Sequence, residues 1–147
     1  MLTKELLKAT GCLKIDVFNP DGSLKETREI DNLVVTVGKD FIASRMVGVA
    51  ANVMSHMAVG TGSTAPVVGN TTLGTETARV ALTSGTASGS VATYVATFGA
   101  GTGTAALTEA GIFNAASVGT MLCRTTFAVV NKGASDAMTI TWTVTIS

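Results

Sequence analysis

The sequence is poor in charge. Charged residues make up 14% of its 147 positions, against roughly 25% in an ordinary soluble domain. Lysine plus arginine equals aspartate plus glutamate at ten each, so the formal net charge is zero. Nucleic-acid binding depends on clustered cations that neutralise phosphates, and this balance gives no basis for it. We therefore expect no nucleic-acid partner.

Cysteine, histidine and long apolar runs are also scarce. Cys12 and Cys123 are too few and too far apart for a disulfide scaffold or a zinc site, and we expect both to be small buried hydrophobes. A single histidine, His56, excludes a histidine-rich metal cluster within one chain. The sequence predicts no metal and no cofactor.

No stretch approaches the roughly 18 uninterrupted apolar residues of a membrane span. The N-terminal run MLTKELLKATG carries Lys4, Glu5 and Lys8, so it lacks the apolar centre of a secretory signal. We expect no membrane partner and synthesis in the cytoplasm.

The few charges are unevenly distributed. Fourteen of the twenty lie in residues 1–45, which leaves six for the rest of the chain. A protein surface with so little charge and no net repulsion tends to associate. We infer that copies of the chain or another protein cover this surface. The alternative is a solvated surface rich in hydroxyl groups, because threonine is both polar and a good strand former.

The closing segment 137–147 reads AMTITWTVTIS, with apolar residues on one parity and Thr or Ser on the other. Such alternation predicts a half-buried β-strand, with Trp142 in the core. Several further short strands with turn signals between them predict one all-β domain over residues 1–147, an antiparallel β-sandwich or jelly-roll-like fold.

The other elements are expected as follows. Residues 11–31 form a charged β-hairpin around an Asn-Pro-Asp-Gly turn, followed by a third apolar run, NLVVTV. One short helix covers about 38–49, capped by Thr36 or Gly38, with Phe41, Ile42, Met46 and Val49 against the sheet. Strands are expected near 55–59, 78–83 and 91–98, and a hairpin joins 111–114 to 120–130. The runs GTGST, SGTASGS and GAGTGT are glycine-rich gaps.

Residues 1–10 form a separate N-terminal arm. Its leucines are the candidate contacts to a neighbouring subunit, because they are apolar and lie outside the main sheet: Leu2, Leu6 and Leu7.

Catalytic patterns are weak. A Ser/His/Asp set around His56 can be drawn, but nothing in the spacing selects it, and the flanking Met54 and Met57 favour a strand residue. The glycine runs lack the lysine and the helix-opening pattern of a phosphate loop. We predict that the chain is not an enzyme.

Glu76 and Glu109 lie in similar contexts, LGTETAR and ALTEAGIF. Paired carboxylates can act as acid and base. We expect instead that each binds local backbone amides or pairs with an arginine such as Arg79 or Arg124.

The order of motifs is more specific than any one of them. NLVVTVGKDFIASRM, SHMAVGTGSTAP, LGTETAR, LTEAGIFNAASVGTMLCRTTF and KGASDAMTITWTVTIS follow one another over roughly residues 32–147. This series resembles a group of small structural proteins of tailed phages, labelled tail-fibre-like, baseplate-like or capsid-associated. The resemblance implies a non-enzymatic, β-rich virion component present in several copies.

Two positions on the particle fit that resemblance. A capsid cement or decoration protein is a compact β-domain, usually trimeric, that binds the major capsid protein and stabilises the shell. A tail-fibre or baseplate component carries a longer shaft or a tip domain. The sequence has no long fibrous repeat and no separate tip, which favours the capsid. A carbohydrate-binding adhesin module and a hydrolase built on Glu76, Glu109 or His56 are the other classes, although the glycine loops lack the aromatics that usually stack on sugars.

Overall fold

The computed structural model describes residues 4–49 and 51–147. Within them lie nine strands and one helix, which confirms the predicted all-β class. The elements are β1 (Ala9–Phe18), β2 (Leu24–Val34), α1 (Thr36–Met46), β3 (His56–Gly60), β4 (Glu76–Ala81), β5 (Ser84–Ser88), β6 (Val91–Phe98), β7 (Ala105–Phe113), β8 (Met121–Lys132) and β9 (Ala137–Ile146). They form one antiparallel sheet in the order β4-β3-β7-β8-β2-β1-β9-β6-β5.

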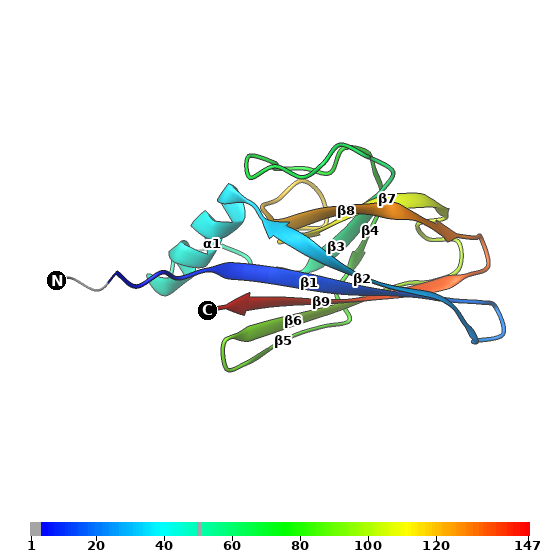
Figure 1. Cartoon of the computed structure of the whole chain (residues 1–147), viewed down its shortest axis with the longest axis horizontal. Helices are drawn as coiled ribbons and strands as arrows, with labels where there is room; N and C mark the ends of the chain where they lie inside the picture. Colours follow the sequence, from blue (N-terminus) through cyan, green and yellow to red (C-terminus); the bar gives the residue numbers. More distant parts are fainter. Residues whose placement is uncertain (1–3, 50) are drawn as a thin grey trace.

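The sheet curls over on itself at β2. Most of β2 pairs with β1, while its last residues pair with β8 through Leu33 opposite Arg124 and Val34 opposite Cys123. The half containing β3, β4, β7 and β8 therefore lies over the half containing β1, β5, β6 and β9, as in a sandwich (Figure 1). The apolar core lies between these halves.

The closing strand forms as predicted. In β9, Met138, Ile140, Trp142 and Val144 are buried, and the threonines between them are half-exposed. β9 lies between β1 and β6, and Trp142 stands opposite Leu13 and Tyr94. The Trp142 indole N–H donates to Asn32 Oδ1 at 3.1 Å. The last strand is thus a central element of the sheet.

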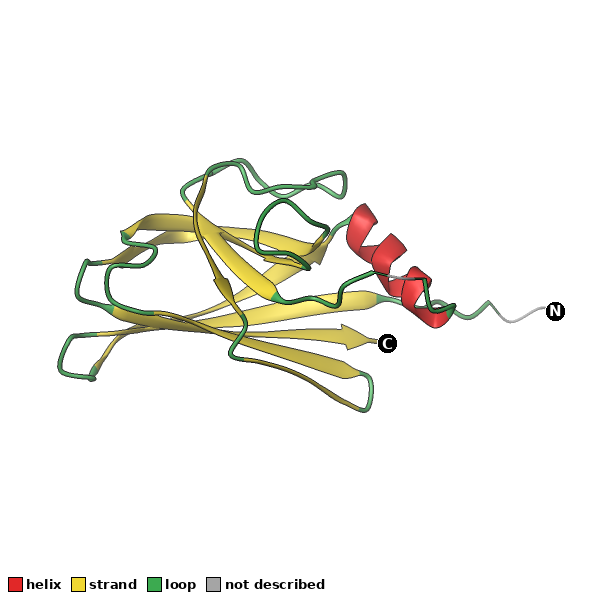
Figure 2. Ribbon diagram, turned by 180° about the vertical axis from the view of Figure 1, so that it is seen from behind, coloured by secondary structure: helices red, strands yellow, loops and turns green. Residues whose placement is uncertain are grey.

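The helix differs from the prediction at both ends. It covers Thr36–Met46 instead of 38–49, and Val35 precedes it without a side-chain cap. Phe41 and Ile42 pack against the core as expected. Met46 and Val49 are exposed, contrary to the prediction. The helix lies across the end of the sandwich where the C-terminus is found (Figure 2).

Four local expectations are wrong. β2 extends unbroken from Leu24 to Val34 and so includes residues 32–34 of the run expected to be separate, while residues 36–37 of that run begin α1. Residues 84–88, placed in a glycine-rich gap, form β5, and β7 begins at Ala105 instead of 111. Cys123 is buried as expected but Cys12 is exposed, because Cys12 shares the outward parity of Lys14 and Asp16 in β1.

Candidate interaction surfaces

The six charged residues that follow Arg45 in the sequence all engage one another or Lys25. Glu76 pairs with Arg79 and Glu109 with Arg124. Lys132 donates to the Asp136 carbonyl, and Lys25 pairs with the Asp136 carboxylate. Of these six, only Glu76 has substantial exposure, at 35% of its side chain. The surface contributed by the later two thirds of the chain is therefore almost free of charge.

The most buried of these pairs joins β7 to β8. Glu109 is fully buried and Arg124 is 2% exposed. One Glu109 oxygen accepts from the Gly74 amide at 2.6 Å and from the Arg124 guanidinium at 3.3 Å. The other accepts from the amides of Gly62 and Thr75. Both carboxylate oxygens thus have two donors, as a buried charge requires.

These bonds hold the 61–75 loop against the outer face of β7 and β8, along the top of Figure 1. Arg124 also donates to Asn70 Oδ1 and to the Thr64 carbonyl, both at 3.0 Å. Leu73 packs beneath the loop with Phe113 and Met121 in a second small core. The glycine run that lacks the pattern of a phosphate loop does bind an anion through one of its amides, that of Gly62, and the anion is the chain's own Glu109.

A second arginine fixes the turn between β7 and β8. The Arg79 guanidinium donates to both Glu76 oxygens, and its carbon lies 3.8 Å from the centre of the Phe113 ring. It also donates to the Ala115 and Val118 carbonyls, at 3.0 and 2.8 Å. Val118 is 79% exposed at this turn and has a φ of 58°.

The third charged group closes the turn between β8 and β9. Lys132 Nζ donates to the carbonyls of Gly99 and Asp136, both at 2.8 Å, and its burial lowers its pKa. The Asp136 carboxylate accepts from Lys25 at 2.7 Å and from the Gly133 amide. These bonds, that from Lys25 above all, lower the pKa of Asp136.

The expected roles of Glu76 and Glu109 are therefore confirmed, since each pairs with an arginine. The two lie in one row of the sheet on either side of Gly60, yet each carboxylate has its own arginine. His56 begins β3 with its Nδ1 2.8 Å from Ser55 Oγ. The involvement of Lys132 was not predicted, because no local pattern relates its amine to the Gly99 carbonyl across the sheet.

The outer face of β5, β6 and β9 forms a neutral surface of hydroxyl groups, here called the hydroxyl face. The register places Thr86, Thr93 and Thr143 in one row, and Thr97 beside Thr139 in another. Its members are half-exposed or exposed: Ser84, Thr86, Ser88, Thr93, Thr97, Thr139, Thr141, Thr143 and Thr145. Charge returns only at β1, where Lys14 and Asp16 stand opposite Thr141 and Thr139.

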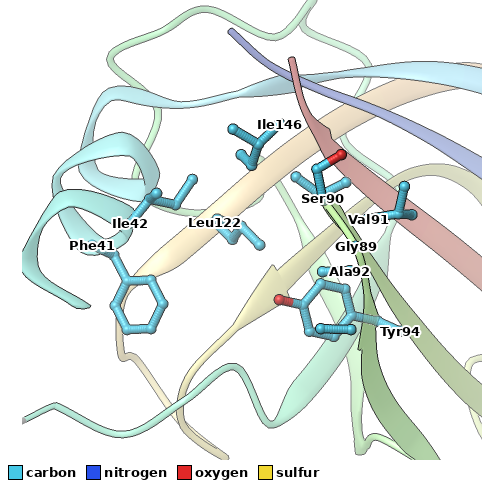
Figure 3. A pocket seen from close by; sticks show the side chains of 11 residues that line it. Phe41, Ile42, Gly89, Ser90, Val91, Ala92, Tyr94, Leu122 and Ile146 are labelled. Atoms are coloured by element: carbon cyan, nitrogen blue, oxygen red, sulfur yellow. The ribbon is translucent and has the colours of Figure 1, made fainter. Parts of the chain in front are cut away.

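The end of the sandwich beside α1 exposes several large apolar side chains. Among the predicted arm contacts, Leu6 is 63% and Leu7 73% exposed, while Leu2 lies outside the described residues. Met46 is 80% exposed on the same end. A hollow of about 240 Å³ opens between α1 and β6, with Phe41 and Ile42 on one side and Ala92 and Tyr94 on the other (Figure 3).

The described residues contain no group of three or more metal-ligating side chains. In that same part of the chain, no helix has the length and apolar character needed to cross a membrane. A scan against protein-family models, a search of curated proteins and a search of solved structures each returned no match.

Proposed function

We propose that the chain is a non-enzymatic structural protein of a tailed-phage particle, a capsid decoration or cement protein. It self-associates and binds the major capsid shell. The observation that carries the proposal is the internal use of all six charges after Arg45. A neutral surface opposes association only weakly, because burying it desolvates few charges and because the partners do not repel each other electrostatically.

The hydroxyl face supports the same role. Threonine and serine hydroxyls both donate and accept hydrogen bonds, so they match a partner backbone or polar side chains without a requirement for opposite charge. The half-buried threonines of β9 also stand on a central strand, bonded on both sides to β1 and β6. Such a face is held rigid, and a rigid surface loses little conformational entropy on binding.

Two of the connecting segments are held by arginine side chains. Buried arginines fix the 61–75 loop and the turn after β7 at carbonyl and carboxylate oxygens. A protein that stabilises a shell under internal pressure benefits from loops that do not yield. The engagement of Glu76 and Glu109 by arginine favours this structural role over a hydrolase.

The test is binding to empty shells assembled from the major capsid protein of the same phage. We expect the protein to co-sediment with the shells, to appear on their outer surface by electron cryomicroscopy, and to raise their temperature of disassembly. Density on tails or baseplates would establish the alternative position on the particle. Absence from every part of the particle would overturn the proposal.

A pair of variants tests the hydroxyl face. Thr143→Arg places a cation in the middle row of that face, beside Thr93, and we expect shell affinity to fall at least tenfold. Thr104→Arg adds the same charge at an exposed threonine between β6 and β7, away from the face, and should bind as the unmodified chain does. Equal binding by the two variants would contradict the assignment of this face to the shell.

A further inference from the structure

The hollow beside α1 is part of a longer apolar groove. It is lined by Phe41 and Ile42 from the helix, with Leu122 at its base and Ala92 and Tyr94 facing them (Figure 3). A second hollow of about 450 Å³ shares Ile42 and Ile146 with the first and continues along α1 past Ala43 and Met46. Together they form what we call the end groove.

In the described part of the arm that precedes β1, residues 4–8, the two leucines are largely exposed. Lys8 and Ser147 exchange backbone hydrogen bonds, which fixes the base of the arm at the end of the sheet. Beyond this point the described residues lie outside the sheet and run away from the body of the molecule (Figure 1). Leu6 and Leu7 remain mostly exposed although Leu7 lies at the rim of the end groove.

We infer that the end groove receives the N-terminal arm of a second copy of this chain, with Leu6 and Leu7 of that copy placed against Ile42, Ala92 and Tyr94. This inference rests on the self-association in the proposed function and names its contact. Among the described residues, each chain has one exposed apolar segment and one open apolar groove at the same end. Exchange of arms between copies satisfies both and closes a cyclic oligomer such as the expected trimer.

The charges at this end complement one another. The arm carries Lys4 and Glu5, and α1 carries Lys39 and Asp40. None of these four forms an ion pair within residues 4–49 and 51–147. Lys39 borders the end groove, so the arm of a neighbour brings Glu5 toward a free cation. In the part of the chain that the structure describes, this end therefore has charges of both signs without an ion-pair partner beside apolar surface.

The first experiment measures self-association of the full chain by sedimentation velocity. Replacing Leu6 and Leu7 together by Asp should raise the dissociation constant of the oligomer at least tenfold and leave the melting temperature of the monomer unchanged, since both side chains are exposed. Ala87→Arg tests the receiving side, because Ala87 is exposed and lines the groove. The matched control is Leu24→Asp, an exposed leucine in the hairpin at the opposite end, which should leave association intact.

The second experiment shows whether the arm acts between chains. In a Cys12→Ser background, one chain carries Leu6→Cys and another carries Ala87→Cys, and the two are mixed and oxidised. Cys123 is buried and does not compete. We expect a disulfide-linked species of twice the chain mass from the mixture. A chain that carries both Leu6→Cys and Ala87→Cys provides the contrary outcome. If this chain forms its disulfide only within itself, the inference is overturned.

The two proposals fail in different ways. An oligomer unaffected by the arm and groove variants, or a chain that is monomeric at every concentration, overturns arm exchange. Binding of that monomer or oligomer to capsid shells would still uphold the decoration role. Arm exchange between chains that bind no particle would uphold the contact and overturn the decoration role.

Discussion

Glu109 and Arg124 are fifteen positions apart in the sequence and form a buried ion pair. Both side chains also form hydrogen bonds to the 61–75 loop and hold it against the sheet. Each Glu109 oxygen receives two donors, so the carboxylate is saturated from four directions. The loop in turn covers the outer face of β7, which explains why that strand is buried on both sides. Glu109 therefore connects the conformation of the 61–75 loop to the stability of the sheet.

Replacing Glu109 by Gln should lower the free energy of unfolding by about 3–5 kcal/mol, because it leaves the Arg124 charge buried without a counter-charge. In the native protein both Glu109 oxygens accept from N–H donors. The NH₂ group of the glutamine side chain replaces one of these oxygens, so two of the donors would face another donor. Chemical denaturation measures the loss, and limited proteolysis should cut the loosened 61–75 loop. Glu26→Gln, in the half-exposed pair with Arg28, should change stability by less than about 1 kcal/mol. Equal effects would show that the enclosed pair has no special role.

Two glycines in the same loop give a matched comparison. A Cβ on Gly62 would lie 2.0 Å from a Glu109 carboxylate oxygen, whereas one on Gly69 meets nothing within 4 Å. Gly62→Ala should therefore destabilise the protein by about 1–3 kcal/mol, as overpacking does. Gly69→Ala should be neutral or stabilising by up to about 1 kcal/mol, since alanine restricts the unfolded chain. Thermal melts of the two variants test this directly, and a harmless Gly62→Ala would contradict the tight fit.

Val118 should improve on substitution. Its φ of 58° places a β-branched residue in the left-handed region, which costs an L-amino acid about 1–2 kcal/mol. Val118→Asn should raise the free energy of unfolding by about 0.5–1 kcal/mol, because Asn accepts this conformation more readily and the side chain is exposed. Val129→Asn, at an exposed strand valine in β8, should not stabilise. A loss of stability in Val118→Asn would instead point to a contact made by the valine itself.

Stability should fall in acid through Asp136. Its hydrogen bond from Lys25 lowers its pKa in the folded state, so the unfolded chain binds the proton more readily. The contribution of ionised Asp136 to the free energy of unfolding is fully present above the usual aspartate pKa of about 3.9. It is lost as the pH falls through the lower folded pKa. Urea midpoints measured from pH 6 to pH 2 should show a smaller acid loss in Asp136→Asn and in Lys25→Met. Lys14→Met, which removes an exposed partner 3.9 Å from Asp16, should retain the full slope.

The strands that the sequence predicts well have one face buried in the core and one face exposed to solvent. β9 and β6 alternate in residue type because the core lies on one side and the hydroxyl face on the other. β7 was predicted only at its end, since the 61–75 loop covers its outer face and removes the alternation. β5 was missed because every residue of this edge strand is exposed, so burial imposes no pattern on SGTAS.

The pairing of the two glutamates with arginines followed from residue type alone, because a sheet with so few charges leaves little else to balance them. The backbone donors to Glu109 did not follow, since Gly62, Gly74 and Thr75 come from a loop whose path depends on the whole fold. The end groove was equally hidden, because it joins the helix to strands more than forty positions away. The leucines of the arm are the one feature of the sequence that leads to the expectation of a contact at this end.

The reciprocal bonds between Lys8 and Ser147 place the start of the sheet and the last residue side by side, at the end that carries the groove. An affinity tag or displayed cargo fused after Ser147 would therefore crowd that end. The tight turn between β1 and β2, at residues 19–23, lies at the far tip of the molecule and is the safer insertion point for engineering this protein.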